Sequence, residues 1–179
     1  AGPLVDGALC FVDRTHIWVE VGGSPVEGAT YIKTSNNDRT ADPYTLDVQA
    51  VEAGTLYLLI DNRVGIPSSD GTPPVLETNM QWVIDQGFVD TGDDIGIDEG
   101  ADGSINQRFS LFSKALPANT LEVLGSQLQS LNNYAVAFVA DANVPSTASY
   151  VIEATGCART ALVGESLPNN GCPTVVRGA

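Results

Sequence analysis

The chain has 179 residues, of which 22 are acidic and 8 basic, giving a formal net charge of −14 at pH 7. This charge excludes a nucleic-acid partner, because phosphate binding needs clustered Lys and Arg side chains, and it disfavours an anionic lipid surface. No apolar run is long enough to span a bilayer, so we expect no membrane insertion. Cations, neutral ligands such as sugars, and other protein chains remain as partners.

Strand patterns dominate the chain. Residues 16–21 and 44–51 alternate in polarity, and residues 55–60 form a continuous apolar run that is typical of a strand covered on both faces. Further strand-like runs lie at 82–84, 108–112, 120–124, 134–140 and 150–154. Turn clusters rich in Gly, Pro and Asn separate these runs, and residues 74–82 are the only modest helical candidate. The pattern predicts an all-β fold, an antiparallel β-sandwich.

No linker-like stretch divides the chain, so we expect a single domain over residues 1–179. We divide it into an N-terminal strand segment (1–30), a core module (31–140) and a C-terminal extension (141–179). Because the first residue is Ala and not Met, we expect that an N-terminal segment has been removed and that the protein is extracellular or on the cell surface.

The densest acidic segment follows residue 85. No basic residue occurs between Arg63 and Arg108, whereas nine acidic residues do. Like charges about 4 Å apart repel by about 1 kcal/mol even in water, so a hard cation with oxygen ligands, calcium above all, would stabilise the segment. The alternative is a solvated acidic loop that keeps the protein soluble. The candidate calcium ligands are Asp90, Asp93, Asp94, Asp98, Glu99 and Asp102.

The acidic segment does not have the spacing of an EF-hand. Asp98, Asp102 and Gly103 match the first, fifth and sixth places of such a loop, but Phe109 stands where the closing Glu belongs. We therefore expect a calcium site of another kind at one rim of the sheets.

Two further groups of polar residues are candidates for ligand binding. Asn36, Asn37 and Asp38 form an oxygen-rich turn that either bonds its own backbone or contacts a metal or a sugar hydroxyl. Asp61 and Arg63 end the most apolar strand and, being two residues apart, point to the same face. This spacing permits either a structural salt bridge or a contact to a polar ligand.

The aromatic and nucleophilic residues give weaker signals. Trp82 is either a core residue or a platform on which a sugar stacks. His16 is the only histidine and no G-x-S-x-G motif occurs, so a Ser or Cys nucleophile with a His partner is not predicted. A facing pair of catalytic carboxylates, as glycoside hydrolysis needs, is not predicted, because the acidic residues cluster in predicted loops. We expect no enzymatic activity.

The chain has three cysteines. A disulfide between Cys157 and Cys172 would close a loop of about 15 residues and contribute roughly 3 kcal/mol in the chain-entropy model. Cys10 would then be a buried apolar residue between Leu9 and Phe11, or would pair between chains. Pairing of Cys10 with one of the other two is the remaining alternative.

A series of short motifs runs from residue 31 to about residue 140. They are Tyr31-Ile-Lys-Thr-Ser-Asn-Asn-Asp38-Arg39, Thr55-Leu-Tyr-Leu-Leu-Ile-Asp61-Asn62-Arg63, Trp82, Gly87-Phe88, Thr91-Gly92, Phe109-Ser-Leu-Phe-Ser-Lys114, Leu124-Gly125 and Asn133-Tyr134-Ala-Val-Ala-Phe138. In their order and spacing these motifs resemble a galactose-binding-like β-sandwich module of secreted bacterial proteins. The resemblance implies a jelly-roll-like sandwich, an extracellular setting and no catalysis. The first thirty residues, the acidic stretch 93–102 and the residues after 145 depart from the module and look like additions.

Two functions are consistent with these features. The first is a self-assembling subunit of an extracellular filament, sheath or surface layer, a homo-oligomer or polymer joined by strand donation from residues 8–21 and stapled by calcium. The chain has only two lysines, Lys33 and Lys114, and lysine normally protects strand edges against pairing. The alternative is a carbohydrate-binding module that recognises an extracellular polysaccharide.

Overall fold

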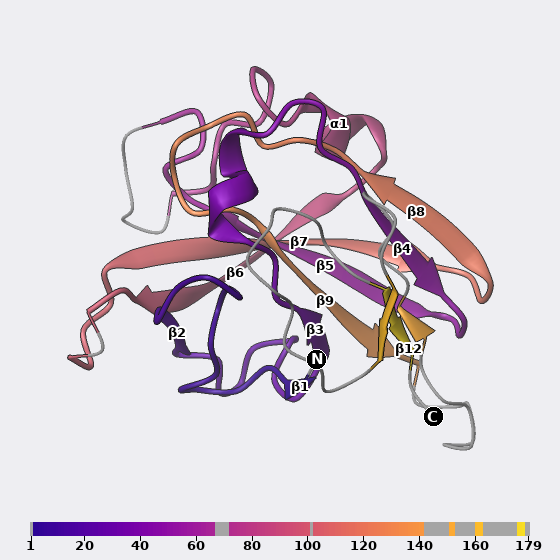
Figure 1. Ribbon diagram of the computed structural model, residues 1–179, viewed down its shortest axis with the longest axis horizontal. Helices are drawn as coiled ribbons and strands as arrows, with labels where there is room; N and C mark the ends of the chain where they lie inside the picture. Colours follow the sequence, from indigo (N-terminus) through magenta and orange to yellow (C-terminus); the bar gives the residue numbers. More distant parts are fainter. Residues whose placement is uncertain are drawn as a thin grey trace.

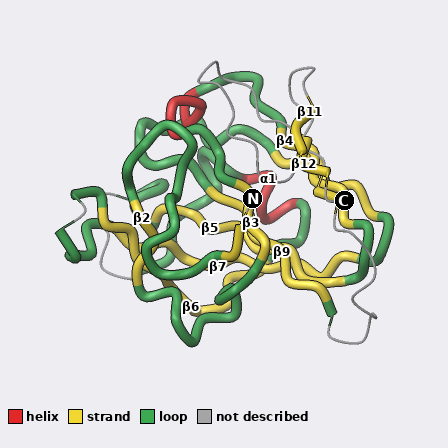
Figure 2. Tube along the Cα trace, turned by 60° about the horizontal axis from the view of Figure 1, so that its bottom comes forward, coloured by secondary structure: helices red, strands yellow, loops and turns green. Residues whose placement is uncertain are grey.

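A computed structural model of the chain describes residues 2–66, 72–100 and 102–141, and the backbone of residues 151–152, 160–162 and 175–177. Strands are the main regular structure of these residues, and helix is confined to a 3₁₀ turn at Asn36–Thr40 and to α1 at Gln81–Asp85 (Figure 2). The strands are β1 (Gly2–Pro3), β2 (Ile17–Val19), β3 (Thr30–Ile32), β4 (Leu46–Ala50), β5 (Gly54–Asp61), β6 (Val89–Asp98), β7 (Gln107–Leu116), β8 (Thr120–Leu124), β9 (Ala135–Ala140), β10 (Val151–Ile152), β11 (Thr160–Leu162) and β12 (Val175–Arg177).

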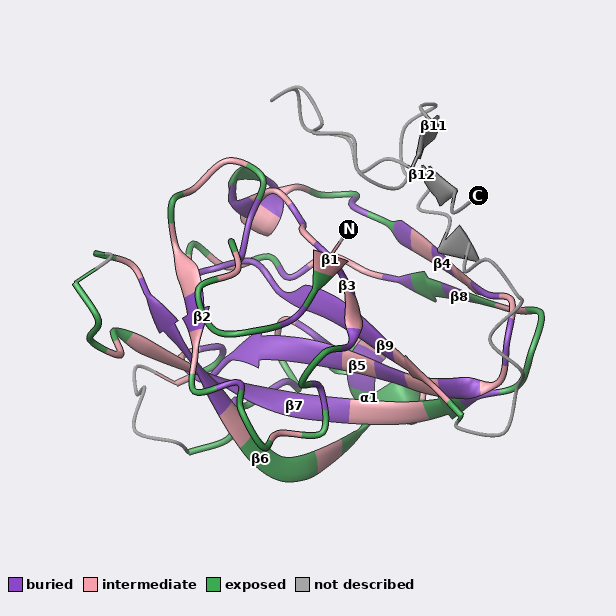
Figure 3. Cartoon of the chain, turned by 90° about the horizontal axis from the view of Figure 1, so that it is seen from below, coloured by how far each residue is buried: buried purple, intermediate pink, exposed green. Residues whose placement is uncertain are grey.

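The principal sheet has seven strands in the order β1-β3-β9-β5-β7-β6-β2, and every neighbouring pair in it is antiparallel (Figure 1). β4 and β8 form a second antiparallel sheet, seen as a separate layer in Figure 3. A small sheet, β10-β12-β11, includes the one parallel pair found among the described strands, β11 with β12. The prediction of an all-β, antiparallel sandwich is confirmed.

The first hydrophobic core lies between the principal sheet and the β4–β8 layer. Leu56, Leu58 and Ile60 of β5 share this core with Val48 of β4 and Leu124 of β8. α1 and the segment before it add Leu76, Met80 and Val83, all buried. Burying such side chains contributes about 1.5–3 kcal/mol each, which makes this layer a main source of stability.

The opposite face of the principal sheet is covered by the N-terminal segment. Leu59 of β5 and Phe109 of β7 point to this face, where Phe11 and Trp18 pack fully buried. Because both faces are covered, Leu58 and Leu59 are buried although they point in opposite directions, as the continuous apolar run of this strand predicted. β1 pairs with β3 and β2 pairs with β6, so residues 2–29 complete the sheet of their own chain.

Most of the acidic segment is a strand and not the predicted loop, while Glu99 and Asp102 lie in the turn that follows it. β6 pairs with β7 over most of its length, and a register shift separates Asp90 from Asp94. Gly92, which lies in this irregularity, has φ +79°, a conformation that favours glycine. The strand starts exposed and ends buried (Figure 3). Its carboxylates are therefore spread along ten residues and are not gathered in one loop.

The predicted strand at residues 82–84 is also wrong, because these residues lie in α1. The helical candidate 74–82 ends where this helix begins. Over the described residues, no helix has the length and apolar character needed to cross a membrane.

Candidate functional site

The end of β5 carries a tightly bonded ion pair. Arg63 donates from Nε to Oδ1 of Asp61 at 2.9 Å and from Nη2 to Oδ2 at 2.5 Å. The Asp61 carboxylate is fully buried, whereas a quarter of the Arg63 side chain is exposed. The hydrogen bonds to Asp61 raise the pKa of Arg63, so the guanidinium stays charged. The two residues thus form the salt bridge that their spacing permits.

Asn132 connects this ion pair to two other predicted site residues. Its side-chain amide donates to Oε1 of Glu99 at 2.7 Å, and its Oδ1 accepts from Nδ2 of Asn36 at 3.2 Å. Its backbone N–H lies 3.4 Å from Oδ2 of Asp61. Asn132 therefore brings four predicted site residues together at one end of the sheet, although the sequence placed it only in a turn. The four are Asn36, Asp61, Arg63 and Glu99.

The Asn36-Asn37-Asp38 turn is held by a residue that was not predicted, Asp13. The Asp13 carboxylate accepts from the backbone N–H groups of Asn36 and Asn37 at 2.8 and 2.9 Å. Burial, followed by the charge of Asp13, raises the pKa of Asp38. Arg14 pairs with Asp13 at 3.2 Å and donates to Oδ1 of Asn37 at 2.7 Å. These bonds give the turn the structural role that was one of its two interpretations.

Trp82 lies apart from the residues around Asn132. Its Nε1 donates to the backbone oxygen of Ser126 at 2.9 Å, and its ring lies against Tyr134 at a centroid distance of 5.7 Å. A Cβ at Gly125 would come within 2.9–3.1 Å of the indole. Trp82 thus packs at the margin of the first core, and the sugar-stacking interpretation of this residue stays a prediction.

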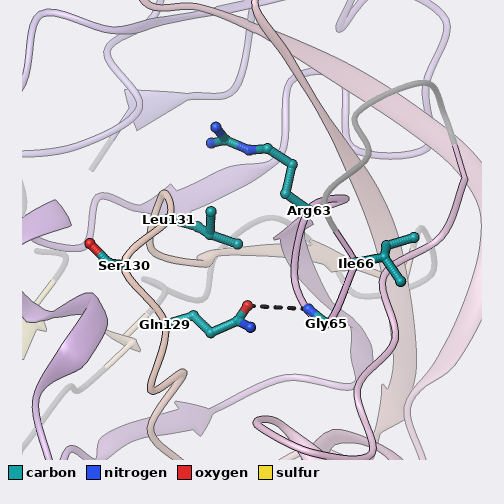
Figure 4. Close-up of a pocket in the computed structure, with 6 residues that line it drawn as sticks. All are labelled: Arg63, Gly65, Ile66, Gln129, Ser130 and Leu131. Atoms are coloured by element: carbon teal, nitrogen blue, oxygen red, sulfur yellow. Dashed lines mark hydrogen bonds between the residues drawn. The ribbon is translucent and has the colours of Figure 1, made fainter.

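A cavity of about 460 Å³ opens beside Arg63 (Figure 4). Two loops form it, one following β5 and one preceding β9. The N–H of Gly65 donates to Oε1 of Gln129 at 3.2 Å and so connects the loops across the cavity. Gly65 has φ +76°, and a Cβ there would lie 2.0 Å from the backbone oxygen of Val75. The lining residues are Arg63, Gly65, Ile66, Gln129, Ser130 and Leu131.

The predicted calcium ligands are engaged mainly by backbone and side-chain donors. Asp98 is buried and accepts from the N–H groups of Gly100 and Gly103 at 2.9 and 2.7 Å, which closes the turn between β6 and β7. Hydrogen bonds from Ser104 lower the pKa of Asp102.

The other carboxylates of the acidic segment are spread along β6. Asp94 accepts from Oγ of Ser110 at 2.8 Å, and Asp90 accepts from the N–H of Gly92 at 2.9 Å. The N–H of Asp93 donates to Oγ1 of Thr91 at 3.1 Å. Among the described residues, no three Asp, Glu, His or Cys side chains are grouped so as to hold a metal ion. The calcium site stays a prediction.

Cys10 is a buried free thiol in the second core, whereas Cys157 and Cys172 lie outside the described residues. Burial raises the pKa of the Cys10 thiol, and thiolate is the reactive form. We expect folded protein at pH 8 to leave this thiol unmodified by iodoacetamide.

Denaturation without reductant should then expose Cys10, and mass spectrometry should show a single modified cysteine if Cys157 and Cys172 are bridged. Modification of all three cysteines would contradict that disulfide. Modification of Cys10 in the folded protein would contradict its burial.

Two exposed apolar side chains lie on the outward face of β8, and we call them the outer patch. Leu121 is 54% exposed and Val123 45%. The Gln86 side chain connects α1 to β8 by donating from Nε2 to the backbone oxygen of Val123 at 2.8 Å. Large apolar side chains that are exposed side by side on one strand face are a candidate interaction surface.

The single histidine has no catalytic partner in the described part of the chain. His16 lies edge-on to Phe11 at a centroid distance of 6.0 Å, and its buried Nδ1 forms no hydrogen bond there.

The chain matches no protein-family model, no curated protein and no solved structure. The galactose-binding-like resemblance therefore stays a prediction, and function must be argued from the geometry.

Proposed function

We propose that this protein is a non-catalytic structural subunit that assembles with copies of itself outside the cell. The observation that carries the proposal is the outer patch on β8. β8 pairs with β4 through five residue pairs, and across its other edge the described residues place no strand. An edge strand with exposed apolar side chains is a template for pairing with another chain.

The charges around β8 support self-association at this edge. Its one charged residue, Glu122, is buried and bonded to Lys114, so the strand presents Leu121 and Val123 outward without an unpaired charge. Copies of a chain with a net charge of −14 repel one another through their charged surfaces. This repulsion is weakest at a strand such as β8, whose outward side chains are apolar and uncharged. The chain has only two lysines, so its strand edges have little of the protection that lysine gives against pairing with another chain.

Replacing Leu121 with Lys is expected to abolish assembly, because a charge on the edge strand opposes pairing and loses the apolar contact. Light scattering after size-exclusion chromatography, with electron microscopy, should show oligomers or polymers for the native chain and monomers for the variant. Val75→Lys is the matched control, since Val75 is 41% exposed outside β4 and β8 and receives the same charge.

A native chain that stays monomeric at high concentration would refute the proposed function. Assembly that survives Leu121→Lys unchanged would instead show that another surface makes the contact. Equal loss of assembly in both lysine variants would point to net charge and not to the β8 edge.

A further inference from the structure

We infer that the outer patch of one copy packs against Leu9 and Val12 of the next copy, so that the chains assemble head to tail. We call these two residues the N-terminal patch. The inference rests on the proposed function and names the surface that β8 contacts. Contact between two different surfaces leaves one of each free on the growing assembly, whereas contact between two copies of the same surface closes at a dimer.

The N-terminal patch is apolar and held in place. Leu9 is 43% and Val12 41% exposed, although the two residues between them, Cys10 and Phe11, are fully buried in the second core. The N–H of Val12 donates to the backbone oxygen of Thr34 at 3.1 Å, which ties this segment to the residues after β3. An ordered surface loses little conformational entropy when it docks, which favours association.

The two patches lie on different layers of the molecule, one on each side of the principal sheet. The N-terminal segment covers one face of this sheet, and the β4–β8 layer lies over the other face (Figure 1). Because the patches are exposed on separate layers, one copy cannot join its own two patches. A contact between them is therefore made with another copy, and each added chain presents a new free patch.

A positive charge lies beside the N-terminal patch. The Nζ of Lys33 is 5.8 Å from the centroid of the Tyr31 ring, and the hydroxyl group of Tyr31 donates to the backbone oxygen of Leu9 at 2.8 Å. Lys33 forms no salt bridge with a carboxylate in the described part of the chain. The side chain of Asp13, by contrast, is fully buried and already paired with Arg14 at 3.2 Å. The ammonium group of Lys33 can therefore pair with an acidic group of a partner.

Two carboxylates border the outer patch. Asp47 is the β4 partner of Val123 and shares its outward face, since the neighbours of Asp47 in β4 are buried. Asp85 ends α1 beside Gln86, whose Nε2 donates to the backbone oxygen of Val123. Two outer patches placed together would bring these like charges together, which disfavours a closed dimer. Packing the outer patch against the N-terminal patch brings the ammonium group of Lys33 to them instead.

Complementation between two assembly-deficient variants tests the inference. Leu121→Lys disrupts the outer patch and Val12→Lys disrupts the N-terminal patch, so we expect each variant alone to be monomeric. Their equimolar mixture should form a dimer with one chain of each kind, because each variant retains the patch that the other lacks. Native mass spectrometry with one variant isotope-labelled identifies this mixed dimer. Val75→Lys carries the same charge away from both patches and should polymerise like the native chain.

Charge reversal tests the pairing of Lys33 with the border of the outer patch. Lys33→Glu replaces an attraction with a repulsion and should raise the protein concentration needed for assembly about fivefold, as expected for an exposed ion pair. Adding Asp85→Lys to the same chain should lower that concentration again, because opposite charges then face one another. Asp85 suits this exchange, since its side chain accepts only an exposed hydrogen bond from Gln81 at 2.9 Å. Unchanged assembly in Lys33→Glu would overturn the assigned pairing of patches.

Three further results would overturn the inference: polymerisation of Val12→Lys, a dimer formed by Val12→Lys alone through its intact outer patch, and the absence of a mixed dimer from two monomeric variants. If Val12→Lys lowers the melting temperature, Leu9→Lys takes its place, since it changes the same patch. None of these results removes the assembly of the native chain. A native chain that stays monomeric refutes the proposed function itself, so the two failures are distinguishable.

Discussion

Replacing Trp18 with Ala is expected to lower the free energy of unfolding by about 4 kcal/mol, within the range for removing a large buried aromatic residue. Trp18 is fully buried on β2, where it pairs with Ile97 of β6. Its ring meets Phe109 edge-on at a centroid distance of 5.3 Å. The substitution would leave a cavity between the N-terminal segment and the principal sheet. Urea denaturation followed by circular dichroism measures the loss.

The same variant tests whether residues 8–21 belong to their own sheet or to that of a neighbour. The comparison is made in the Leu121→Lys background, because assembly through β8 would itself make the urea midpoint depend on protein concentration. If the segment packs within its own chain, the midpoints with and without Trp18→Ala should not change with concentration in that background. Midpoints that rise with concentration there would support the predicted strand donation. Val12→Ala is the control, because Val12 is 41% exposed and its truncation should cost little.

The most apolar strand was predictable, because its pattern depends on burial alone. The run 55–60 lies within β5, where Leu58 and Leu59 enter different cores. In a strand that is covered on both faces, side chains of both orientations are buried, and a continuous apolar run predicts this arrangement. The predicted run 120–124 coincides with β8, whose alternation separates buried from exposed side chains.

β6 was not predictable from local preference, since Asp and Gly are disfavoured in strands. The strand forms because Ile95 and Ile97 are buried in the second core and because β7 and β2 pair with it from either side. Tertiary contacts override the propensity there. The carboxylates near its start are tolerated because that part of the strand faces solvent.

The candidate site was predictable only where its residues are neighbours in sequence. Asp61 ends β5 and Arg63 lies in the turn that follows it, where the Arg63 N–H and guanidinium both donate to the Asp61 carboxylate two residues earlier. Gln129 and Asn132 reach the same region from a loop more than sixty residues later, and only the pairing of β9 with β5 brings them there. No local signal distinguishes these two residues from other turn residues.

Replacing Lys114 with Met is expected to destabilise the protein by about 3 kcal/mol, at the low end of the range for breaking a buried ion pair. Glu122 is 8% exposed, and its carboxylate bonds to Nζ of Lys114, which also lies 5.5 Å from the centroid of the Phe88 ring. Lys114 is itself a quarter exposed, so water offsets part of the loss. Removing the ammonium group leaves a carboxylate buried on the inner side of β8 without its partner.

A double variant distinguishes two free energies: the destabilisation caused by leaving Glu122 without its partner, and the net stabilisation that the ion pair gives over two apolar side chains. Lys114→Met combined with Glu122→Leu should recover most of the stability, because two apolar side chains need no charge partner. Lys33→Met controls for net charge: it removes the only other lysine, whose Nζ lies 5.8 Å from the Tyr31 ring, and should cost about 1 kcal/mol or less. Equal urea midpoints for the two lysine variants would contradict a buried pair. A large loss confined to Lys114→Met would show that this lysine neutralises a buried carboxylate on the inner face of β8, the strand whose outward side chains the proposed assembly uses.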